Sequence, residues 1–305
     1  MNRQNLLTLL ATFALLFCFT YSCNAKGKDK AKHVVFIGLD GWGAYSLPKA
    51  DMPNVKKLME DGSYTLKKRS ALPSSSAINW ASMFMGAGPE LHGYTEWGSK
   101  TPELPSRVLN KNGIFPTVFQ LLRDARPEAE IGCLYEWEGI KYLVDTLSLN
   151  YHYHVADCNK TPKELGNMAS AYIKEKHPAL VAICYDGPDH TGHTEGHDTP
   201  AYYEKLKELD IYVGQIVQAV KDAGILDDTI FILTSDHGGI DKGHGGKTMQ
   251  EMETAFIISG KNIKKGLRFD DVSMMQYDVA STIASIFNLE QPQVWIGRPM
   301  KMVFK

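Results

Sequence analysis

The amino-acid sequence predicts an α/β protein, a three-layer α/β/α sandwich with a mainly parallel central sheet. The first observation is that short apolar runs, typical of buried strands, alternate along the chain with longer segments whose apolar residues recur at helical spacing. The second is that the strand-like runs are apolar throughout, as expected for strands covered on both faces. The third is that Asp, Ser or Gly follows several of these runs, where such a sheet presents its polar groups.

Each predicted element follows from its own local pattern. The strands are expected at residues 33–39, 130–135, 179–185, 229–234 and 255–259. The helices are expected at residues 53–62, where a glycine closes the pattern, and at 76–85, 117–125, 163–176, 202–223 and around 277–287. The helix at 202–223 is the longest, and one of its faces carries Leu206, Leu209, Val213, Ile216, Val217 and Val220.

Length and composition fit one domain at residues 26–305. A chain of 305 residues that is 44% hydrophobic can bury a large core. No internal repeat is visible, and the irregular stretch at 94–159 is the natural place for a substrate-facing insertion. The net charge of −2 gives no electrostatic case for a nucleic-acid polymer as partner. The oligomeric state is left open.

Residues 1–25 have the form of an export signal. Arg3 precedes an apolar stretch from Leu6 to Phe19, which is shorter than the roughly 20 residues that a membrane-spanning helix needs. Cys23 follows Thr-Tyr-Ser, similar to a bacterial lipoprotein box, so Cys23 is a candidate for a lipid anchor. Ordinary cleavage after Ala25 is the alternative. We therefore expect a periplasmic protein or a membrane-anchored lipoprotein of a bacterium. A disulfide between Cys133 and Cys158 is compatible with export, although no feature of the sequence requires it.

Acidic, histidine and serine residues recur at the ends of the apolar runs. They lie in the segments VVFIGLDGWG, SSSAINWASMFMG, YDGPDHTGH, LTSDHGG and KGHGG, and the residues are Asp40, Ser76, Asp189, His193, Asp236, His237 and His244. Single carboxylates at strand ends are often turn residues. That explanation does not suit DGPDHTGH, which places an Asp and a His four residues apart in what we expect to be a glycine-rich loop. Asp and His side chains are suitable ligands for zinc, and two divalent ions about 4 Å apart serve phosphoryl transfer.

The order of these motifs resembles the type I phosphodiesterase/nucleotide pyrophosphatase family of the alkaline phosphatase superfamily. The similarity covers roughly residues 33–260 and includes GLDG, a Ser three residues before Asn79, the run Pro89-Glu90-x-His92-Gly93, Pro188-Asp189-x-x-x-His193, Asp236-His237-Gly238 and His244-Gly245. The resemblance implies that one metal is held by Asp189, His193 and His244. It implies that Asp40, Asp236, His237 and the Ser76 oxygen hold the other.

The resemblance implies that Ser76 is the nucleophile, since the family carries a Thr or Ser three residues before an Asn that is followed seven residues later by a glycine, here Asn79 and Gly86. Ser76 also opens a predicted helix, whose N-terminus favours an anionic phosphate. A plain helix cap is the alternative, and Ser74 and Ser75 compete for the assignment. Asn79, one turn further on, is expected to donate to a phosphate oxygen. Trp80 is a candidate to stack on substrate or, equally, to pack in the core. Glu96, Trp97, Trp137, Lys242 and Lys247 are candidate pocket walls. His190 and His197 match no ligand position, and we expect them to support the ligands or to face solvent.

These observations predict an exported phosphoric ester hydrolase that uses two divalent ions, with ligand types that favour zinc. The expected substrate is a small phosphodiester or pyrophosphate, since no arginine in the motifs could serve the extra charge of a monoester. A phosphomonoesterase on the same scaffold is the alternative. A sulfatase is disfavoured, because the Cys/Ser-x-Pro-x-Arg pattern is absent at residues 74–78. The alternative from another functional class is a non-catalytic surface lipoprotein that binds ligands. A measurement of bound metal would distinguish it from an enzyme, because a binding protein need not hold two ions per chain. The context Ser-Ala-Ile-Asn-Trp departs from the family's common Thr-Phe-Pro-Asn-His, which puts a nucleotide preference in doubt.

Overall fold

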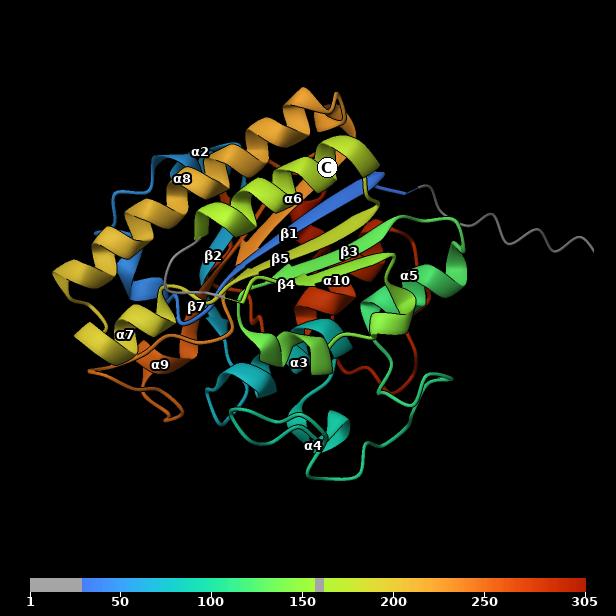
Figure 1. The fold of residues 1–305 in the computed structure, drawn as a ribbon, viewed down its shortest axis with the longest axis horizontal. Coiled ribbons are helices and arrows are strands. Elements are labelled where there is room, and N and C mark those ends of the chain that lie inside the picture. Colours follow the sequence, from blue (N-terminus) through green and yellow to red (C-terminus); the bar gives the residue numbers. More distant parts are fainter. Residues whose placement is uncertain (1–28, 157–161) are drawn as a thin grey trace, which may run out of the picture.

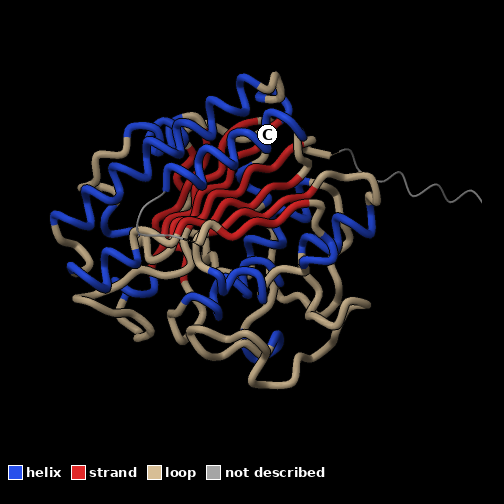
Figure 2. Tube along the Cα trace, in the orientation of Figure 1, coloured by secondary structure: helices blue, strands red, loops and turns tan. Residues whose placement is uncertain are grey.

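The computed structural model describes residues 29–156 and 162–305 and has three layers. A central sheet separates two groups of helices, with α2, α6 and α8 above it and α3, α5 and α10 below it in Figure 1. Figure 2 shows the strands running side by side through the middle of the molecule, with the longest loops on the lower side. The predicted α/β/α sandwich is therefore confirmed.

The described sheet has the strand order β4-β3-β5-β1-β6-β7-β2-β8. Neighbours from β4 to β6 run parallel, whereas β7 runs antiparallel to both β6 and β2. The strands are β1 (His33–Leu39), β2 (Gly62–Arg69), β3 (Ile131–Tyr135), β4 (Tyr151–His154), β5 (Leu180–Tyr185), β6 (Thr229–Thr234), β7 (Glu253–Gly260) and β8 (Leu267–Arg268). The sequence did not predict β2, β4 and β8, because these carry charged or exposed residues instead of a continuous apolar run.

The helices cover the sheet with apolar faces that form two separate cores. One core joins α3, α5 and α10 to the lower face of the sheet, and the other joins α2, α6 and α8 to the upper face. The α-helices are α2 (Pro53–Glu60), α3 (Ser76–Met85), α4 (Pro89–His92), α5 (Val118–Ala125), α6 (Pro162–Lys176), α7 (Asp189–Glu195), α8 (Pro200–Asp222), α9 (Met249–Met252) and α10 (Asp278–Ile286). Short 3-10 turns are η1 (Ala44–Ser46), η2 (Glu138–Tyr142), η3 (Thr146–Ser148), η4 (Leu226–Asp228) and η5 (Lys301–Val303).

The stretch at 94–159, expected to hold an insertion, is only partly irregular. Its strands β3 and β4 belong to the central sheet, and α5 packs into the lower core. The loop from 93 to 117 and the segment that follows β3 remain as candidates for a substrate-facing part.

The predictions for residues 1–25 and for Cys158 lie outside the described residues. Within the described part of the chain, no helix combines the length and apolar character required to cross a membrane. Cys133 and Cys184 are both buried free thiols.

Candidate metal and catalytic centre

The predicted ligands meet at the carboxyl edge of three adjacent parallel strands. β1 lies between β5 and β6, so that Leu39 pairs with Tyr185 and Gly38 with Thr234. Asp40 follows β1, Asp189 begins α7 shortly after β5, and Asp236 and His237 follow β6. These residues are far apart in the sequence but lie close together, because parallel strands end at the same edge of the sheet.

The three histidines present the same ring nitrogen to a common centre. Nδ1 of His193 donates to the carbonyl of Lys242 (2.9 Å), Nδ1 of His237 to that of Gly238 (2.7 Å), and Nδ1 of His244 to that of Ser74 (3.0 Å). Because a carbonyl only accepts, each Nδ1 carries a proton, and each Nε2 is left for contacts within the cluster of candidate ligands. The hydrogen bond with Asp189, at 3.0 Å from His193 Nε2, raises the pKa of His193 to about 9. Outer hydrogen bonds of this kind orient metal-ligating histidines.

The carboxylates at this centre are buried and only partly satisfied. Oδ1 of Asp40, Oδ1 of Asp189 and Oδ2 of Asp236 have no hydrogen-bond partner, although the three side chains are almost fully buried. Burial, followed by repulsion from Asp236 and Asp189, raises the pKa of Asp40 well above its usual range. Unpaired buried carboxylates are costly unless a cation neutralises them. The donor set of this protein therefore fits bound divalent cations.

Two groups of ligand atoms can each hold one ion. Asp189, His193 and His244 form the first, with His193 Nε2 at 3.0 Å from Asp189 Oδ2 and at 3.2 Å from His244 Nε2. Asp40 and His237 form the second together with Asp189, and Asp40 Oδ1 lies 3.4 Å from His237 Nε2. Asp236 Oδ2 lies 3.3 Å from His237 Nε2. Asp189 thus stands between the two groups, a position that the sequence did not indicate.

Among the three consecutive serines, Ser76 has its hydroxyl at the ligand cluster. Its Oγ lies 3.1 Å from His237 Nε2, and Ser76 is the first residue of α3, as predicted. Ser74 Oγ is occupied instead, since it donates to the carbonyl of Gly246 (2.7 Å) and accepts from the N–H of Gly245 (3.2 Å). Ser75 occupies the N-cap position of α3 and does not line the cavity that Ser76 lines. The geometry favours Ser76 over both neighbours.

Two glycines allow the close packing that positions the ligands. A Cβ at residue 38 would lie 2.2 Å from the Trp80 ring, and one at residue 41 would lie 2.5 Å from the Asp189 carboxylate. Gly41 also has φ = 69°, a left-handed conformation that favours glycine. Because residue 38 has no side chain, the Trp80 indole lies against the sheet and its Nε1 donates to Asp40 Oδ2 at 2.9 Å.

The structure corrects the predicted roles of Asn79 and Trp80. The Asn79 side chain is fully buried, and its amide nitrogen donates to the carbonyls of Ala71, Pro73 and Ser75 at 3.0–3.2 Å. Its Oδ1 accepts the N–H of Ala71 at 2.7 Å. Asn79 therefore folds the segment before α3 and has no donor left for a phosphate. Trp80 is also fully buried, so that it supports Asp40 and does not offer a face to substrate.

Two residues outside the predicted ligand set support it: His197, for which a supporting or solvent-exposed role was expected, and Lys68, which sequence reasoning missed. His197 is buried between Gly192 and Gly239, with Nε2 at 3.6 Å from Asp189 Oδ1, and burial lowers its pKa to about 4. Lys68 is fully buried, and its Nζ donates to the carbonyl of Ser235 at 2.8 Å, directly before Asp236. Lys68 gave no signal, because a lysine in the run KKR resembles a surface residue.

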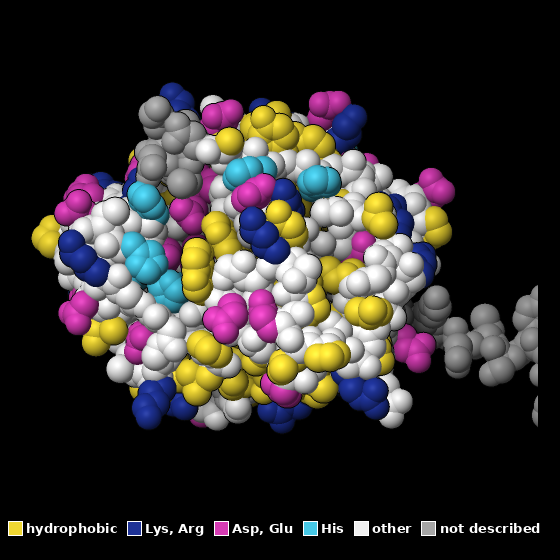
Figure 3. Space-filling view, turned by 60° about the horizontal axis from the view of Figure 1, so that its bottom comes forward, with side chains coloured by type: hydrophobic (Ala, Val, Ile, Leu, Met, Phe, Trp, Pro, Cys, Tyr) yellow, Lys and Arg dark blue, Asp and Glu magenta, His cyan; other side chains and the backbone are white. Residues whose placement is uncertain are grey.

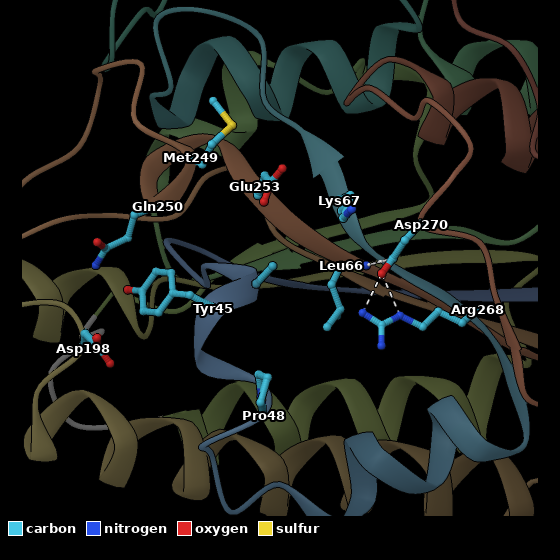
Figure 4. A pocket seen from close by; sticks show the side chains of 11 residues that line it. Tyr45, Pro48, Leu66, Lys67, Asp198, Met249, Gln250, Glu253, Arg268 and Asp270 are labelled. Carbon is cyan, nitrogen blue, oxygen red and sulfur yellow. Dashed lines mark hydrogen bonds and ion pairs between the residues drawn. The ribbon is translucent and has the colours of Figure 1, made fainter.

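A cavity of 160 Å³ opens at the ligand cluster. It is lined by Asp40, Ser76, Trp97, Trp137, Asp186, Asp189, His190, His193 and His244. Trp97 and Trp137 were candidate pocket walls and do line it, whereas Glu96, Lys242 and Lys247 do not. Histidine side chains gather on the left of the face in Figure 3, next to acidic and hydrophobic side chains. A second cavity of 380 Å³ lies beside Tyr45 and the Arg268–Asp270 ion pair (Figure 4), and none of the predicted ligands lines it.

Comparisons with known proteins agree with this geometry. Residues 34–272 match the family model described as type I phosphodiesterase / nucleotide pyrophosphatase. Bis(5'-adenosyl)-triphosphatase of Mus musculus is 26% identical over 221 residues, which are 69% of this chain and 48% of that protein. GPI ethanolamine phosphate transferase 3 of Schizosaccharomyces pombe is 30% identical over 122 residues, 39% of this chain and 13% of the relative. The chain thus spans about half the length of the first relative and much less of the second.

Solved structures share the fold at low sequence identity. Murine ectonucleotide pyrophosphatase/phosphodiesterase 5 in complex with AMP has a TM-score of 0.68 at 15% identity, covering 86% of this chain and 96% of that one. A 2-O GAG sulfatase has a TM-score of 0.71 at 14% identity, covering 89% and 73%. The family match includes all seven predicted ligand and nucleophile positions. The chain belongs to the type I phosphodiesterase/nucleotide pyrophosphatase family of the alkaline phosphatase superfamily.

Proposed function

We propose that this protein is an exported phosphodiesterase that holds two divalent ions, zinc by preference, and uses Ser76 as its nucleophile. The observation that carries the proposal is the cluster of three imidazole Nε2 atoms and three buried carboxylate oxygens without hydrogen-bond partners, with the Ser76 hydroxyl at 3.1 Å from the Nε2 of His237. Three His and three Asp ligands suit zinc better than magnesium or calcium, which prefer oxygen ligands alone.

When bound, the ions supply Lewis-acid charge that favours the Ser76 alkoxide and stabilises the negative charge of the transition state. Ser76 loses its hydroxyl proton to solvent, and its Oγ forms a bond to phosphorus while the bond to the leaving alcohol breaks. The departing alkoxide takes up a proton from water. A water molecule then hydrolyses the phosphoseryl ester, which restores Ser76 and releases a phosphate monoester. The net reaction consumes one water molecule for each diester.

A diester is the preferred substrate class because the cavity is poor in positive charge. Within the described residues, its lining contains neither lysine nor arginine. A monoester dianion would bring a second charge without a basic side chain to bind it, whereas a diester carries a single negative charge. Asn79 no longer supports the choice of a diester, because its side-chain amide is hydrogen-bonded to the backbone of Ala71 and Ser75 and does not donate to phosphate.

The proposal is tested with zinc-loaded protein on bis(p-nitrophenyl) phosphate and p-nitrophenyl phosphate. We expect the diester to be turned over with the higher kcat/KM, and Ser76→Ala to abolish turnover while zinc content stays near two ions per chain. Ser75→Ala is the matched control, since the adjacent serine does not line the cavity. Full activity in Ser76→Ala would refute the nucleophile. Metal-loaded protein that cleaves no ester would favour a binding protein, and a monoester preference would change the substrate class.

Export is the part of the proposal that rests on sequence alone. The apolar stretch after Arg3 and the residues around Cys23 support it, and they precede the described part of the chain. Mass spectrometry of the protein purified from a bacterial host distinguishes the outcomes. A lipid-modified Cys23 at the new N-terminus indicates an anchored lipoprotein, a start at Lys26 indicates cleavage after Ala25, and an intact Met1 argues against export.

A further inference from the structure

Four large apolar side chains are exposed on two segments that hydrogen bonds join. They are Leu104, Val108 and Leu109 of the loop that follows α4, and Leu147 of η3, and we call them the apolar patch. Leu109 is 59% exposed and Leu147 is 75% exposed, the highest value for a large apolar side chain among the described residues. Figure 3, in which the lower side of Figure 1 comes forward, shows hydrophobic side chains gathered on the lower part of this face. Exposed apolar patches mark contacts with partners or membranes.

Hydrogen bonds hold both segments of the apolar patch in place. Asn110, which follows Leu109, donates from its side-chain amide to Asp145 Oδ2 at 2.8 Å, and Leu147 lies two residues after this aspartate. At the other end of the loop, the N–H of Leu104 donates to the carbonyl of residue 93 at 3.1 Å. The backbone is thus fixed on both sides of the loop, so that the exposure of these side chains is a property of the fold.

The last turn of α5 contacts both segments of the apolar patch. Nε of Arg123 donates to the carbonyl of residue 148, directly after Leu147, at 3.1 Å. Oδ1 of Asp124 pairs with Nζ of Lys111, two residues after Leu109, at 2.6 Å. The end of α5 therefore lies beside the apolar patch.

The same end of α5 holds the start of the described chain. Arg126 donates from Nη2 to Asp29 Oδ1 at 2.7 Å. Asp29 is six residues after Cys23, the candidate lipid anchor, and six residues of chain span at most about 20 Å. A lipid on Cys23 would keep the end of α5 close to the bilayer, and the apolar patch with it. This position distinguishes a membrane from other possible partners of the patch.

The charges next to the apolar patch are compatible with lipid headgroups. Arg107 stands within the loop, and a long basic side chain can lie along an apolar surface while its charged end reaches the headgroups. Glu103, the acid beside Leu104, is engaged by its own loop. Its Oε2 accepts from the N–H of Thr95 and from the hydroxyl of Ser99, each at 2.8 Å.

We propose that the apolar patch rests in the headgroup region of the bilayer to which Cys23 anchors the chain. The inference goes beyond the proposed phosphodiesterase activity and rests on the export part of that proposal. Apolar side chains with basic neighbours bind at the boundary between headgroups and acyl chains. The protein then has a fixed orientation on the membrane and does not turn freely about its tether.

The test places an environment-sensitive label at the apolar patch and at a control position. Leu109→Cys, Leu147→Cys and Ile211→Cys are each labelled with nitrobenzoxadiazole in the full chain, which also carries Cys158→Ser. Ile211 is the matched control, since it is apolar and 60% exposed but lies on α8, in the other helix layer (Figure 1). The remaining described cysteines are buried and stay unlabelled; they are Cys133 and Cys184.

The labelled proteins are mixed with vesicles of phosphatidylethanolamine and phosphatidylglycerol. At residues 109 and 147, we expect the emission to shift to the blue by about 10 nm or more and to be quenched by spin-labelled lipid, whereas the label at residue 211 shows neither effect. No response at residues 109 and 147 overturns the inference. An equal response at residue 211 overturns it as well, because the label itself then enters the bilayer. A blue shift without vesicles that grows with protein concentration overturns it in favour of self-association.

Substitutions then assign the contact to the apolar patch. Leu104→Ser combined with Val108→Ser should at least halve the lipid quenching of the label at residue 147. Ile211→Ser combined with Leu226→Ser is the matched control, because it also removes two exposed apolar side chains, but from α8 and η4. Unchanged quenching in the first pair, or an equal loss in both pairs, contradicts the assignment.

Failure of the proposed function remains distinguishable from failure of this inference. Mass spectrometry of the same samples reports the state of Cys23, and hydrolysis of bis(p-nitrophenyl) phosphate is measured separately. A lipid on Cys23 without a label response refutes the membrane contact and leaves the anchor and the activity standing. An unmodified start at Lys26 or Met1 without a label response refutes anchor and contact together. A protein that responds at residues 109 and 147 but cleaves no diester supports the membrane contact and refutes the phosphodiesterase.

Discussion

Replacing Trp80 by phenylalanine tests how the protein holds the buried carboxylate of Asp40, a candidate metal ligand. The indole Nε1 donates to Asp40 Oδ2 at 2.9 Å, and the ring stacks on Phe84 at a centroid distance of 5.9 Å. Trp80→Phe keeps an aromatic ring but removes the donor and part of the packed volume. The lost packing should cost about 1–2 kcal/mol. The carboxylate oxygen left without its donor should cost a further ~1–3 kcal/mol.

The same substitution should also weaken metal binding. Removal of an outer hydrogen bond to a metal ligand typically costs 10- to 100-fold in affinity, so we expect zinc affinity to fall by about that factor. Trp295→Phe is a matched control, because the Trp295 indole lies against Gly86 and donates to the carbonyl of Pro116 at 3.0 Å, away from the ligands. It should lower stability to a similar degree while leaving zinc affinity unchanged.

Two measurements separate these effects. Thermal unfolding of the metal-free proteins reports the packing and hydrogen-bond terms, and competition with a chromophoric zinc chelator reports metal affinity. The reasoning predicts that both variants melt earlier and that only Trp80→Phe loses zinc affinity. Equal zinc affinity in Trp80→Phe and the wild-type protein would refute the role assigned to this indole.

Three further outcomes follow from the structure. Removing divalent ions with EDTA should lower the thermal midpoint, because an ion present at 1,000 times its Kd contributes about 4 kcal/mol and relieves the buried carboxylates; an unchanged midpoint would mean that they do not bind metal. Burial raises the pKa of Glu136 to about 8. The unfolded chain loses this proton near its ordinary pKa of 4.5 while the folded protein keeps it, so stability should fall between about pH 4.5 and 8 and then level off. Thermal midpoints across this range should therefore depend less on pH in Glu136→Gln, but not in Glu138→Gln at an exposed neighbour, and equal slopes in all three proteins would contradict the assignment. Asn79→Ala should cost roughly 2–3 kcal/mol, because it breaks the hydrogen bonds to residues 71–75, yet leave the KM for a diester within about twofold; a large rise in KM at unchanged stability would restore the phosphate-donor role.

Local sequence patterns predicted most of the elements that hold the site. β1, α3 and β6 have the predicted bounds, because an apolar run or a helical apolar spacing is a property of consecutive residues. The segment at 189–195 was expected to be a glycine-rich loop but is the short helix α7. The strands β2 and β4 were missed because their pairing partners, and not their own composition, keep them in the sheet.

The candidate ligands, which the structure brings together at one edge of the sheet, were also named from the sequence, but the roles of their neighbours were not. Asn79 lies on the same helix as Ser76, and helical spacing alone placed both toward substrate. The structure shows that the segment before α3 folds back onto Asn79 and uses all of its hydrogen-bonding groups. Spacing defines a face of a helix, but only the neighbouring segments determine whether that face is covered.

The sequence by itself determined the fold class and the family and named the candidate metal ligands, because periodicity and short motifs encode these locally. Only the tertiary structure decided that Asp189 stands between the two ligand groups, that Ser76 and not Ser74 meets the ligand cluster, and that Trp80 supports Asp40. It also brought Trp97, Trp137 and Asp186 to one cavity. These relations join residues far apart in the chain, and they arise from strand order and from close packing at Gly38 and Gly41, which no local pattern specifies.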